Sequence, residues 1–399
     1  MWAAIADIGR DPSSGGYRRF AWSDDDQTLR EWFAGECAAR GLDLTEDRMG
    51  NQWAWWGDPD AAVARGEKGI ATGSHLDSVP DGGAFDGPLG VVSALAAVDA
   101  LRASGFTPRV PMAVVNFVDE EGARFGVACA GSRVITGALS PERALDLTDA
   151  DGTTMAEALT EAGRDAGAVG RDDETLARVG AFVELHVEQG RALADPEHPA
   201  YGHAVAIGSG IWPHGRWRLD FPGEANHAGT TRLEHRHDAM LGFAETVLAA
   251  RWTADKHGAV ATMGKVQVVP NGVNAIPSAV TGWLDARSAE EPAVRATVAE
   301  ISGTAMGAGA TLTEESWTPK TVFDTGLVAR LQTRLGGIPL LGTGAGHDAG
   351  ILSTAGIPAA MLFVRNPTGV SHSPAEWAQE KDCLAGVDAL AAVLEDLAG

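Results

Sequence analysis

Cysteine is scarce in this chain of 399 residues. The three cysteines, Cys37, Cys129 and Cys383, are widely separated, form no CxxC pair and leave one unmatched, so a disulfide framework is not expected. This pattern fits a reducing compartment best, which predicts a cytoplasmic protein.

Long apolar runs and basic clusters are also lacking. No stretch reaches the roughly 18 apolar residues of a membrane span, and residues 1–11 lack the basic and apolar regions of an export signal. Lysine and arginine number 31 against 54 acidic residues, and no local basic cluster offsets the net charge of -23. Nucleic-acid and membrane binding are therefore not expected, and an anionic substrate would need dedicated local cations.

What is present is typical of a globular protein long enough for two domains, with 45% hydrophobic residues. Apolar residues recur at helical spacing over 26–44 and 90–104, whereas KGIATGS, VPMAVVNFV and VGAFVELHV predict short buried strands. Residues 139–180 have helical spacing and predict a helical connection. Strands that alternate with helices indicate an α/β sheet.

The pattern changes near residue 208. The segments RWRLDFPGEANHAG, AVATMGKVQVVPN and AVTGWLDARS predict antiparallel strands, and helices are expected at 238–256 and 291–306. We therefore predict a smaller α/β domain with a four-stranded antiparallel sheet over 208–318. The alternation of strands and helices then resumes, so the larger domain is expected to be discontinuous, over 1–207 and 319–399.

The segment GSHLDSVPDGGAFDGPLG places His75 directly after a predicted strand, at a sheet edge where α/β proteins bind ligands. Asp77 can hydrogen-bond the ring nitrogen that a metal does not use. The glycines before Asp86 allow that residue to approach closely. Taken alone, this segment is more typical of an exposed loop than of a metal site.

The segment NFVDEEGARFG ends another strand in three consecutive acids, Asp119, Glu120 and Glu121. Three adjacent carboxylates repel one another, and a cation would relieve that repulsion. One carboxylate can bind metal while its neighbour takes a proton. A solvated acidic turn is the alternative for this tripeptide alone.

Two further histidines are candidate ligands in segments of the same kind: His186 in ELHVEQG and His372 in VSHSPAEW. Each histidine alone is more often structural than a ligand, but four such segments in one chain favour a metal centre. Nitrogen and carboxylate ligands without cysteine suit zinc, manganese, cobalt or nickel, and a bridging aspartate makes a two-metal site. Two divalent metal ions can polarise an amide carbonyl and deliver hydroxide.

At these segments the sequence resembles the M20-type metallohydrolase superfamily, in the branch of N-carbamoyl-L-amino acid hydrolases, allantoate amidohydrolases and ureidopropionases. The matching motifs cover most of the chain in family order, from GSHLDSVPDGGAFDG through DEEGARFG, HVEQG, NHAGTTR, NAIP, DAR and GAGHDA to SHSPAE. The resemblance implies a zinc-peptidase-like catalytic domain with a mixed sheet, interrupted by a lid domain that also forms a homodimer.

The resemblance also implies roles for single residues. Asp86 would bridge two metal ions, completed by His75 and His186 on one side and by Glu121 and His372 on the other. Glu120 would be the general base, taking a proton from the bridging water and delivering it to the leaving nitrogen.

In the lid, the resemblance implies that His227 reaches across the dimer to stabilise the developing oxyanion. Asn274 and Arg287 would hold the substrate carboxylate, for which paired guanidinium donors are suited. Without the resemblance, a surface salt bridge would be the better interpretation of Arg287.

Three residues are less specific. Gln189 and His347, the latter in GAGHDAG, are candidate substrate contacts with a structural loop role as the alternative. Arg365 in LFVRNPTG lies outside the shared motifs. It could bind a second anionic or ureido group, or simply pair with an acid.

The leading hypothesis is therefore metal-dependent hydrolysis of a C–N bond in a small anionic N-carbamoyl or ureido acid, such as an N-carbamoyl-L-amino acid or allantoate, with release of ammonia. An M20-type dipeptidase or N-deacylase would share the metal site, but the forms ELHVEQG and GAGHDA favour the carbamoylase side. A binding protein without catalysis is a third hypothesis. It would be marked by loss of the base or a ligand, and all six residues are present.

Overall fold

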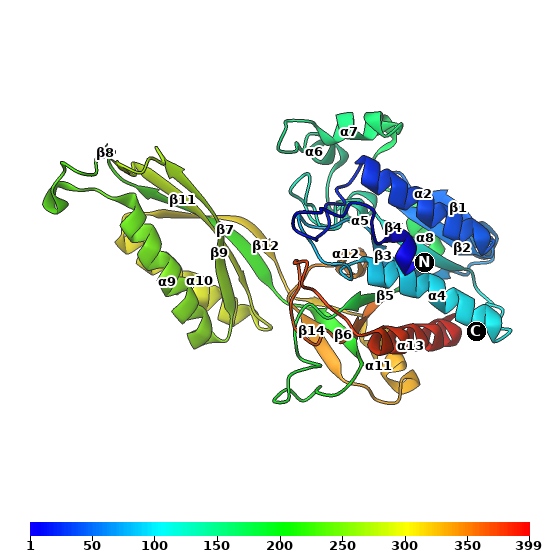
Figure 1. The fold of residues 1–399 in the computed structure, drawn as a ribbon. Helices are drawn as coiled ribbons and strands as arrows, with labels where there is room; N and C mark the ends of the chain where they lie inside the picture. Colours follow the sequence, from blue (N-terminus) through cyan, green and yellow to red (C-terminus); the bar gives the residue numbers. More distant parts are fainter. The chain divides into compact units, whose positions relative to one another are not determined.

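The computed structural model describes residues 1–399, which form two compact units (Figure 1). Unit 1 comprises Met1–Gly210 and Val322–Gly399, and unit 2 comprises Ile211–Thr321. No helix in either unit has the length and apolar character needed to cross a membrane.

Unit 1 is built on a nine-stranded mixed sheet with the order β1-β2-β4-β3-β5-β15-β6-β13, in which β14 also pairs with β6. The strands are β1 (Asp43–Glu46), β2 (Gln52–Trp56), β3 (Gly69–His75), β4 (Met112–Phe117), β5 (Val179–Val187), β6 (Val205–Ile211), β13 (Thr321–Val322), β14 (Leu340–Thr343) and β15 (Ala359–Val364).

The four central strands, β4, β3, β5 and β15, pair in parallel. Every residue of β3, β4 and β15 is buried, which fits their apolar-rich sequences, since such strands are covered on both faces. Parallel pairing brings the carboxyl ends of all four strands to the same edge of the sheet. The ends of these strands and the loops that leave this edge carry the candidate metal ligands.

Helices pack on the sheet of unit 1. The first long ones are α2 (Asp24–Ala39), which Ser23 caps, and α4 (Pro88–Ala103). On α4, a Cβ at Gly90 would lie 2.3 Å from the carbonyl oxygen of Leu185, so glycine permits the close approach of α4 to β5. The others are α1 (Trp2–Ile5), α3 (Pro59–Ala64), α5 (Ala130–Thr136), α6 (Pro141–Leu145), α7 (Met155–Glu161), η1 (Ala166–Ala168), α8 (Asp173–Arg178), α11 (Thr325–Arg334), α12 (Asp348–Thr354) and α13 (Glu380–Ala398).

Unit 2 contains a four-stranded antiparallel sheet with the order β12-β7-β11-β9. Its strands are β7 (His214–Pro222), β9 (Val260–Val269), β11 (Ala279–Arg287) and β12 (Thr311–Thr318). Alternate residues of β11 are buried, and the buried face packs with α9 (Ala239–His257) and α10 (Glu291–Gly307) in one core. A separate two-stranded ribbon joins β8 (Asn226–His227) to β10 (Ala275–Ile276), and η2 (Leu233–His235) follows β8.

The expected fold class, a mixed α/β sheet with a separate four-stranded antiparallel sheet, is confirmed. The helical connection over 139–180 consists of several short helices and not one long one. The structure adds elements that the sequence did not indicate, including β1, β2, β6 and β12.

Candidate metal centre

Five predicted ligands meet at the carboxyl edge of the parallel strands. His75 ends β3, His186 lies near the end of β5, and Glu121 and His372 lie in the loops that follow β4 and β15. Asp86 precedes α4. The nitrogen and oxygen atoms of these residues form two groups, each within 4.8 Å: His75, Asp86 and His186 in one, and Asp86, Glu121 and His372 in the other.

Asp86 belongs to both groups and offers one oxygen to each. Its Oδ1 lies 3.1 Å from His186 Nε2 and 3.9 Å from His75 Nε2. Its Oδ2 lies 3.3 Å from His372 Nε2, which is itself 3.6 Å from Glu121 Oε2. A carboxylate placed in this way has the geometry of a bridging ligand.

The Nδ1 atoms of the two buried histidines already have hydrogen-bond partners. His75 Nδ1 lies 3.1 Å from the carbonyl oxygen of Asp77, and His186 Nδ1 lies 2.9 Å from that of Val187. A carbonyl can only accept, so both Nδ1 atoms carry protons, which leaves the Nε2 lone pairs facing the centre, as a metal requires.

The carboxylate of Asp77 connects two of the segments that carry ligands. It accepts hydrogen bonds from the backbone N–H groups of Glu120 and Glu121, at 3.2 and 3.0 Å, and lies 3.4 Å from His75 Nδ1. One buried side chain therefore fixes the loop after β4 relative to the end of β3.

Two local features allow the loops to come this close. A Cβ at Gly87 would lie 2.4 Å from the imidazole of His75, so only glycine lets the Asp86 loop pass over that ring. His372 adopts a left-handed backbone with φ 53, which is uncommon for a residue other than glycine and is concentrated at functional sites.

The electrostatics favour a cation. Burial, together with Asp86, raises the pKa of Glu121 to about 8, and burial raises the pKa of Glu120 well above its ordinary value. Burial opposes ionisation of Asp86 too, but the hydrogen bond and charge of His186 hold the pKa of Asp86 low. The buried atom Glu121 Oε1 has no hydrogen-bond partner, and His186 Nε2 has only the carboxylate of Asp86 beside it. Divalent cations fit these donors and would offset the carboxylate charge.

Gln189 and His347 also lie at the centre. Gln189 donates from Nε2 to Asp86 Oδ2 at 3.0 Å and lies 3.3 Å from His372 Nε2. The His347 ring is 4.6 Å from that of His186, and both of its nitrogens are buried without partners. Burial, with the nearby His186, holds the pKa of His347 well below its ordinary value, so this imidazole is neutral.

Arg365 has another partner. Its Nε and Nη2 donate to the carboxylate of Asp382 on α13 at 2.9 and 2.8 Å, and Asp382 is buried. The guanidinium therefore ties the end of β15 to a helix, the second of the two interpretations given above. We do not include Arg365 among the proposed substrate contacts.

The sequence reasoning missed Glu376, which belongs to the SHSPAE motif. Its Oε1 accepts hydrogen bonds from the N–H groups of Phe85 and Asp86 at 2.8 and 2.9 Å. Glu376 therefore ties the loop that carries His372 to the loop that carries Asp86. The presence of Glu376 in a shared motif was the only signal in the sequence.

The remaining predicted residues lie in unit 2. His227 and Asn274 are exposed on the ribbon, where the Asn274 carbonyl accepts from Ala228 N–H at 2.9 Å. His227 Nδ1 accepts from Gly229 N–H at 3.0 Å, so its Nε2 carries the proton and is available as a donor. Arg287, at the end of β11, binds Asp285 with 2.6 and 2.9 Å contacts.

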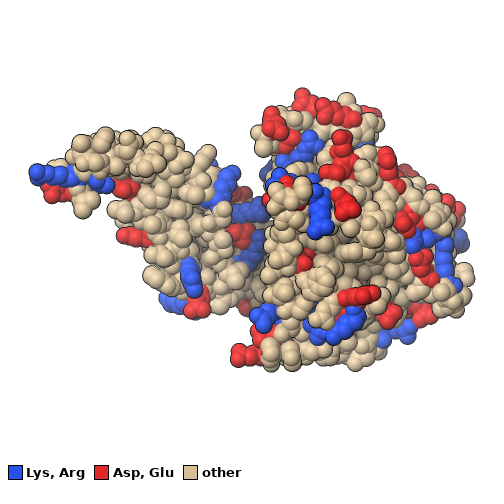
Figure 2. Space-filling model, in the orientation of Figure 1, with Lys and Arg blue, Asp and Glu red and all other residues tan.

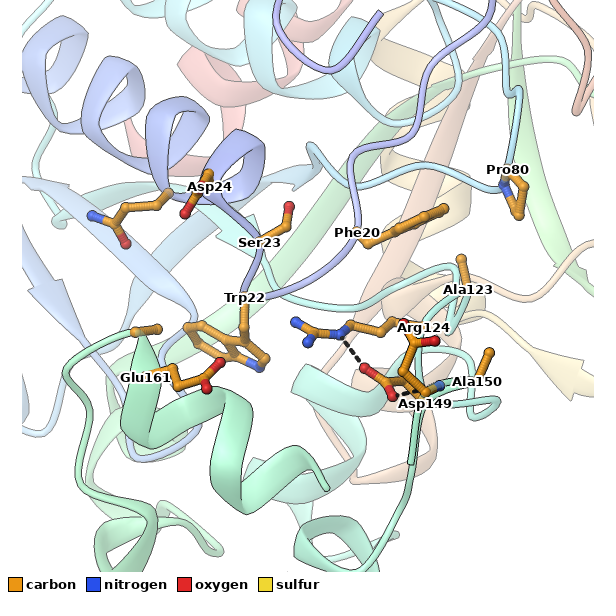
Figure 3. Close-up of a pocket in the computed structure, with 13 residues that line it drawn as sticks. Phe20, Trp22, Ser23, Asp24, Pro80, Ala123, Arg124, Asp149, Ala150 and Glu161 are labelled. Atoms are coloured by element: carbon orange, nitrogen blue, oxygen red, sulfur yellow. Dashed lines mark hydrogen bonds and ion pairs between the residues drawn. The ribbon is translucent and has the colours of Figure 1, made fainter. Parts of the chain in front are cut away.

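A cavity of about 760 Å³ lies beside the loop that follows Glu121 (Figure 3). Its one arginine, Arg124, is held by Asp149 at 3.1 Å and by the carbonyl of Ala21. No residue of the metal centre lines it, and its other charged residues are all acidic: Asp24, Asp149, Asp151 and Glu161. This cavity does not suit an anionic substrate.

Comparison with known proteins identifies the family of the chain. Residues 71–396 match the model of peptidase family M20/M25/M40. The chain is 35% identical to an N-carbamoyl-L-amino acid amidohydrolase of Geobacillus stearothermophilus over 97% of this chain and 94% of that one. It is 29% identical to the allantoate amidohydrolase of Escherichia coli over 99% and 96% of the two chains.

Solved structures give the same result. A hydantoinase/carbamoylase family amidase from Burkholderia vietnamiensis superposes with a TM-score of 0.84 at 30% identity, covering 100% of this chain and 95% of that one. The family model spans most of the sequence, and the relatives align along nearly their whole length. The chain belongs to peptidase family M20/M25/M40 and is an amidohydrolase of that family.

Proposed function

We propose that the chain hydrolyses the C–N bond of an N-carbamoyl or ureido acid and releases ammonia. The observation that carries this proposal is the position of Asp86, whose two carboxylate oxygens face two separate groups of ligands beside Glu120. Relatives that act on N-carbamoyl-L-amino acids and allantoate support the substrate class.

The residues at the centre fit two divalent ions, drawn from zinc, manganese, cobalt or nickel. His75, Asp86 and His186 would hold one, and Asp86, Glu121 and His372 the other. When bound, the ions would polarise the scissile carbonyl and favour hydroxide as the nucleophile.

Glu120 would act as the general base. It is buried, and its Oε2 lies 3.7 Å from His75 Nε2, inside the group of ligands. Glu120 would accept a proton from the attacking water and return it to the leaving nitrogen. With an N-carbamoyl amino acid, water and substrate then yield ammonia, carbon dioxide and the free amino acid.

Unit 2 would bind the rest of the substrate, as a lid on a catalytic unit 1. Arg287, oriented by Asp285, and Asn274 would hold the substrate carboxylate, and His227 Nε2 would donate to the developing oxyanion. Gln189 and His347 would contact the substrate beside the ions.

Arg287→Lys is expected to lower kcat/KM by about 10- to 100-fold, since lysine keeps the charge but loses the paired donors of a charged hydrogen bond. Metal content should not change, because Arg287 belongs to unit 2. Arg218→Lys is the matched control: Arg218 lies on β7 and pairs with Asp220 at 2.9 Å in the same way. Equal effects in steady-state kinetics of the two variants would contradict the role of Arg287.

We further propose a homodimer through unit 2. Strand β9 is an edge strand with exposed Val260, Val266 and Val269, and edge strands readily pair with another chain. Leu241, Leu248 and Trp252 are exposed at helical spacing on α9, which packs against β9. Much of the visible surface of unit 2 carries no charged side chain (Figure 2). A second copy of the chain would cover this apolar surface.

If His227 serves the partner's site, mixing inactive Glu120→Gln protein with inactive His227→Ala protein should restore activity. With random exchange about half the dimers are mixed, and each has one intact site of two, so recovery should approach a quarter of wild type. Ammonia release before and after subunit exchange measures this.

The control pairs Glu120→Gln with Asp86→Ala. Each chain supplies both Glu120 and Asp86 to its own site. In a mixed dimer each site therefore carries one of the two substitutions, and no site is intact. If exchange is demonstrated and the first mixture stays as inactive as this control, His227 does not act across the dimer.

The cytoplasmic location stays a prediction from the sequence.

A further inference from the structure

The chain after Glu121 turns back and runs beside the end of β4. Cys129, Ala130 and Gly131 donate backbone hydrogen bonds to the carbonyls of Glu120, Asp119 and Val118 at 2.5, 3.0 and 3.0 Å, respectively. Gly122 makes the turn possible, because its φ is +60 and a Cβ there would lie 2.4 Å from the backbone of Val127. The turn places Cys129 directly beside Glu120.

The thiol of Cys129 contacts the carboxyl group of Glu120. Its Sγ lies 3.2 Å from Oε1, and no other side chain hydrogen-bonds this carboxyl group. The other oxygen, Oε2, lies 3.7 Å from His75 Nε2 at the metal centre. The two carboxyl oxygens therefore have different surroundings: one faces sulfur, and the other faces the ligands.

Cys129 is held in this position by the backbone. It precedes α5 in a left-handed conformation with φ 55, and its side chain makes no capping hydrogen bond to the helix. A residue with a Cβ is strained in this conformation, which is found preferentially at functional sites. The side chain is 2% exposed, and burial, with Glu120, raises the pKa of the thiol well above its usual range, so it retains its proton.

We propose that Cys129 is a positioning residue for Glu120. The S–H group of Cys129 holds Glu120 Oε1, so that Glu120 Oε2 faces the metal centre and exchanges the proton of the attacking water. This inference rests on the proposed hydrolysis. A thiol suits the task because it is a weak donor. It orients one carboxylate oxygen and leaves the other free to exchange the proton, a role that a serine hydroxyl at the same position can also fill.

The kinetic test compares metal-loaded wild type with Cys129→Ala, Cys129→Ser and Cys37→Ala. All of these residues have a Cβ, so the backbone strain at 129 is unchanged, and Cys37 provides a buried thiol in α2 as the control. Cys129→Ala should lower kcat about three- to tenfold, the range of one net hydrogen bond, with KM and metal content unchanged. Cys129→Ser should keep most of the activity, and Cys37→Ala should match wild type.

Crystal structures of the metal-loaded variants give a second measurement that does not depend on turnover. In Cys129→Ala the Glu120 carboxyl group should rotate or occupy two orientations, whereas in Cys129→Ser it should stay in place. Unchanged kcat together with an unchanged Glu120 in Cys129→Ala would overturn the inference, as would a loss of kcat that Cys129→Ser or Cys37→Ala shares. If wild type hydrolyses no ureido or amide substrate, the proposed function fails, and the crystal structures still decide whether Cys129 orients Glu120.

Discussion

Glu120→Gln is expected to bind metal as the wild type does and to lose turnover by about a hundredfold to ten-thousandfold, the range of general acid–base catalysis. The amide is nearly isosteric with the carboxyl group, but it cannot accept a proton from water. Steady-state ammonia release and metal analysis on the same sample measure the two properties together.

Glu188→Gln is the matched control for this change. Glu188 is also buried just beyond a parallel strand, but its carboxylate accepts hydrogen bonds from the backbone of Ala192 and Leu193, away from the ligands. This variant should remain active. Near-normal turnover of Glu120→Gln would remove Glu120 from its proposed role.

Asp86→Ala is expected to reduce the content of both metal ions and to abolish activity. Asp86 is the only residue shared by the two groups of ligands, so its loss leaves two cations facing each other without a common anion. Metal content per chain after dialysis against a weak chelator measures the effect.

Asp81→Ala provides the control for Asp86→Ala. Asp81 lies in the same loop, but it pairs with Arg18 at the surface. It should retain metal and activity. If Asp86→Ala still held two tightly bound ions per chain, the bridging role of Asp86 would be wrong.

The central part of the fold could be predicted from sequence because its signals are local. The strands β3, β4 and β5 are buried segments rich in apolar residues, and candidate ligands lie at the end of each strand or just after it. Parallel pairing then requires those side chains to meet at one edge. The positions of His75 and His186 at the centre follow from that pattern.

Other elements gave no such signal. Strand β1 is short and largely exposed, and most residues of β12 are exposed or only half-buried, so neither has a clear apolar alternation. Residues 139–180 have helical spacing throughout, yet turns divide them into several short helices. In these segments, tertiary contacts decide what local propensity leaves open.

Contacts between residues far apart in the sequence could not be predicted either. Glu376 binds the backbone of Asp86 across 290 residues, and Arg365 finds its acid on α13. Neither partner could be chosen from the sequence, because many acids and arginines were available. The contact between Cys129 and Glu120 depends on the left-handed backbone of Cys129, a conformation that a cysteine does not indicate in a sequence.

Ammonia release from wild-type protein that has been stripped of metal and then reloaded tests the proposed metal-dependent hydrolysis most directly. Zinc, manganese, cobalt and nickel would each be added to the apoprotein with N-carbamoyl-L-amino acids, N-carbamoyl-β-alanine, allantoate and simple dipeptides as substrates. We expect no activity in the apoprotein, recovery at close to two ions per chain, and ammonia from at least one carbamoyl or ureido acid in preference to dipeptide cleavage. Activity that survives complete metal removal, or a fully loaded protein that cleaves only dipeptides or nothing, would contradict the proposed hydrolysis.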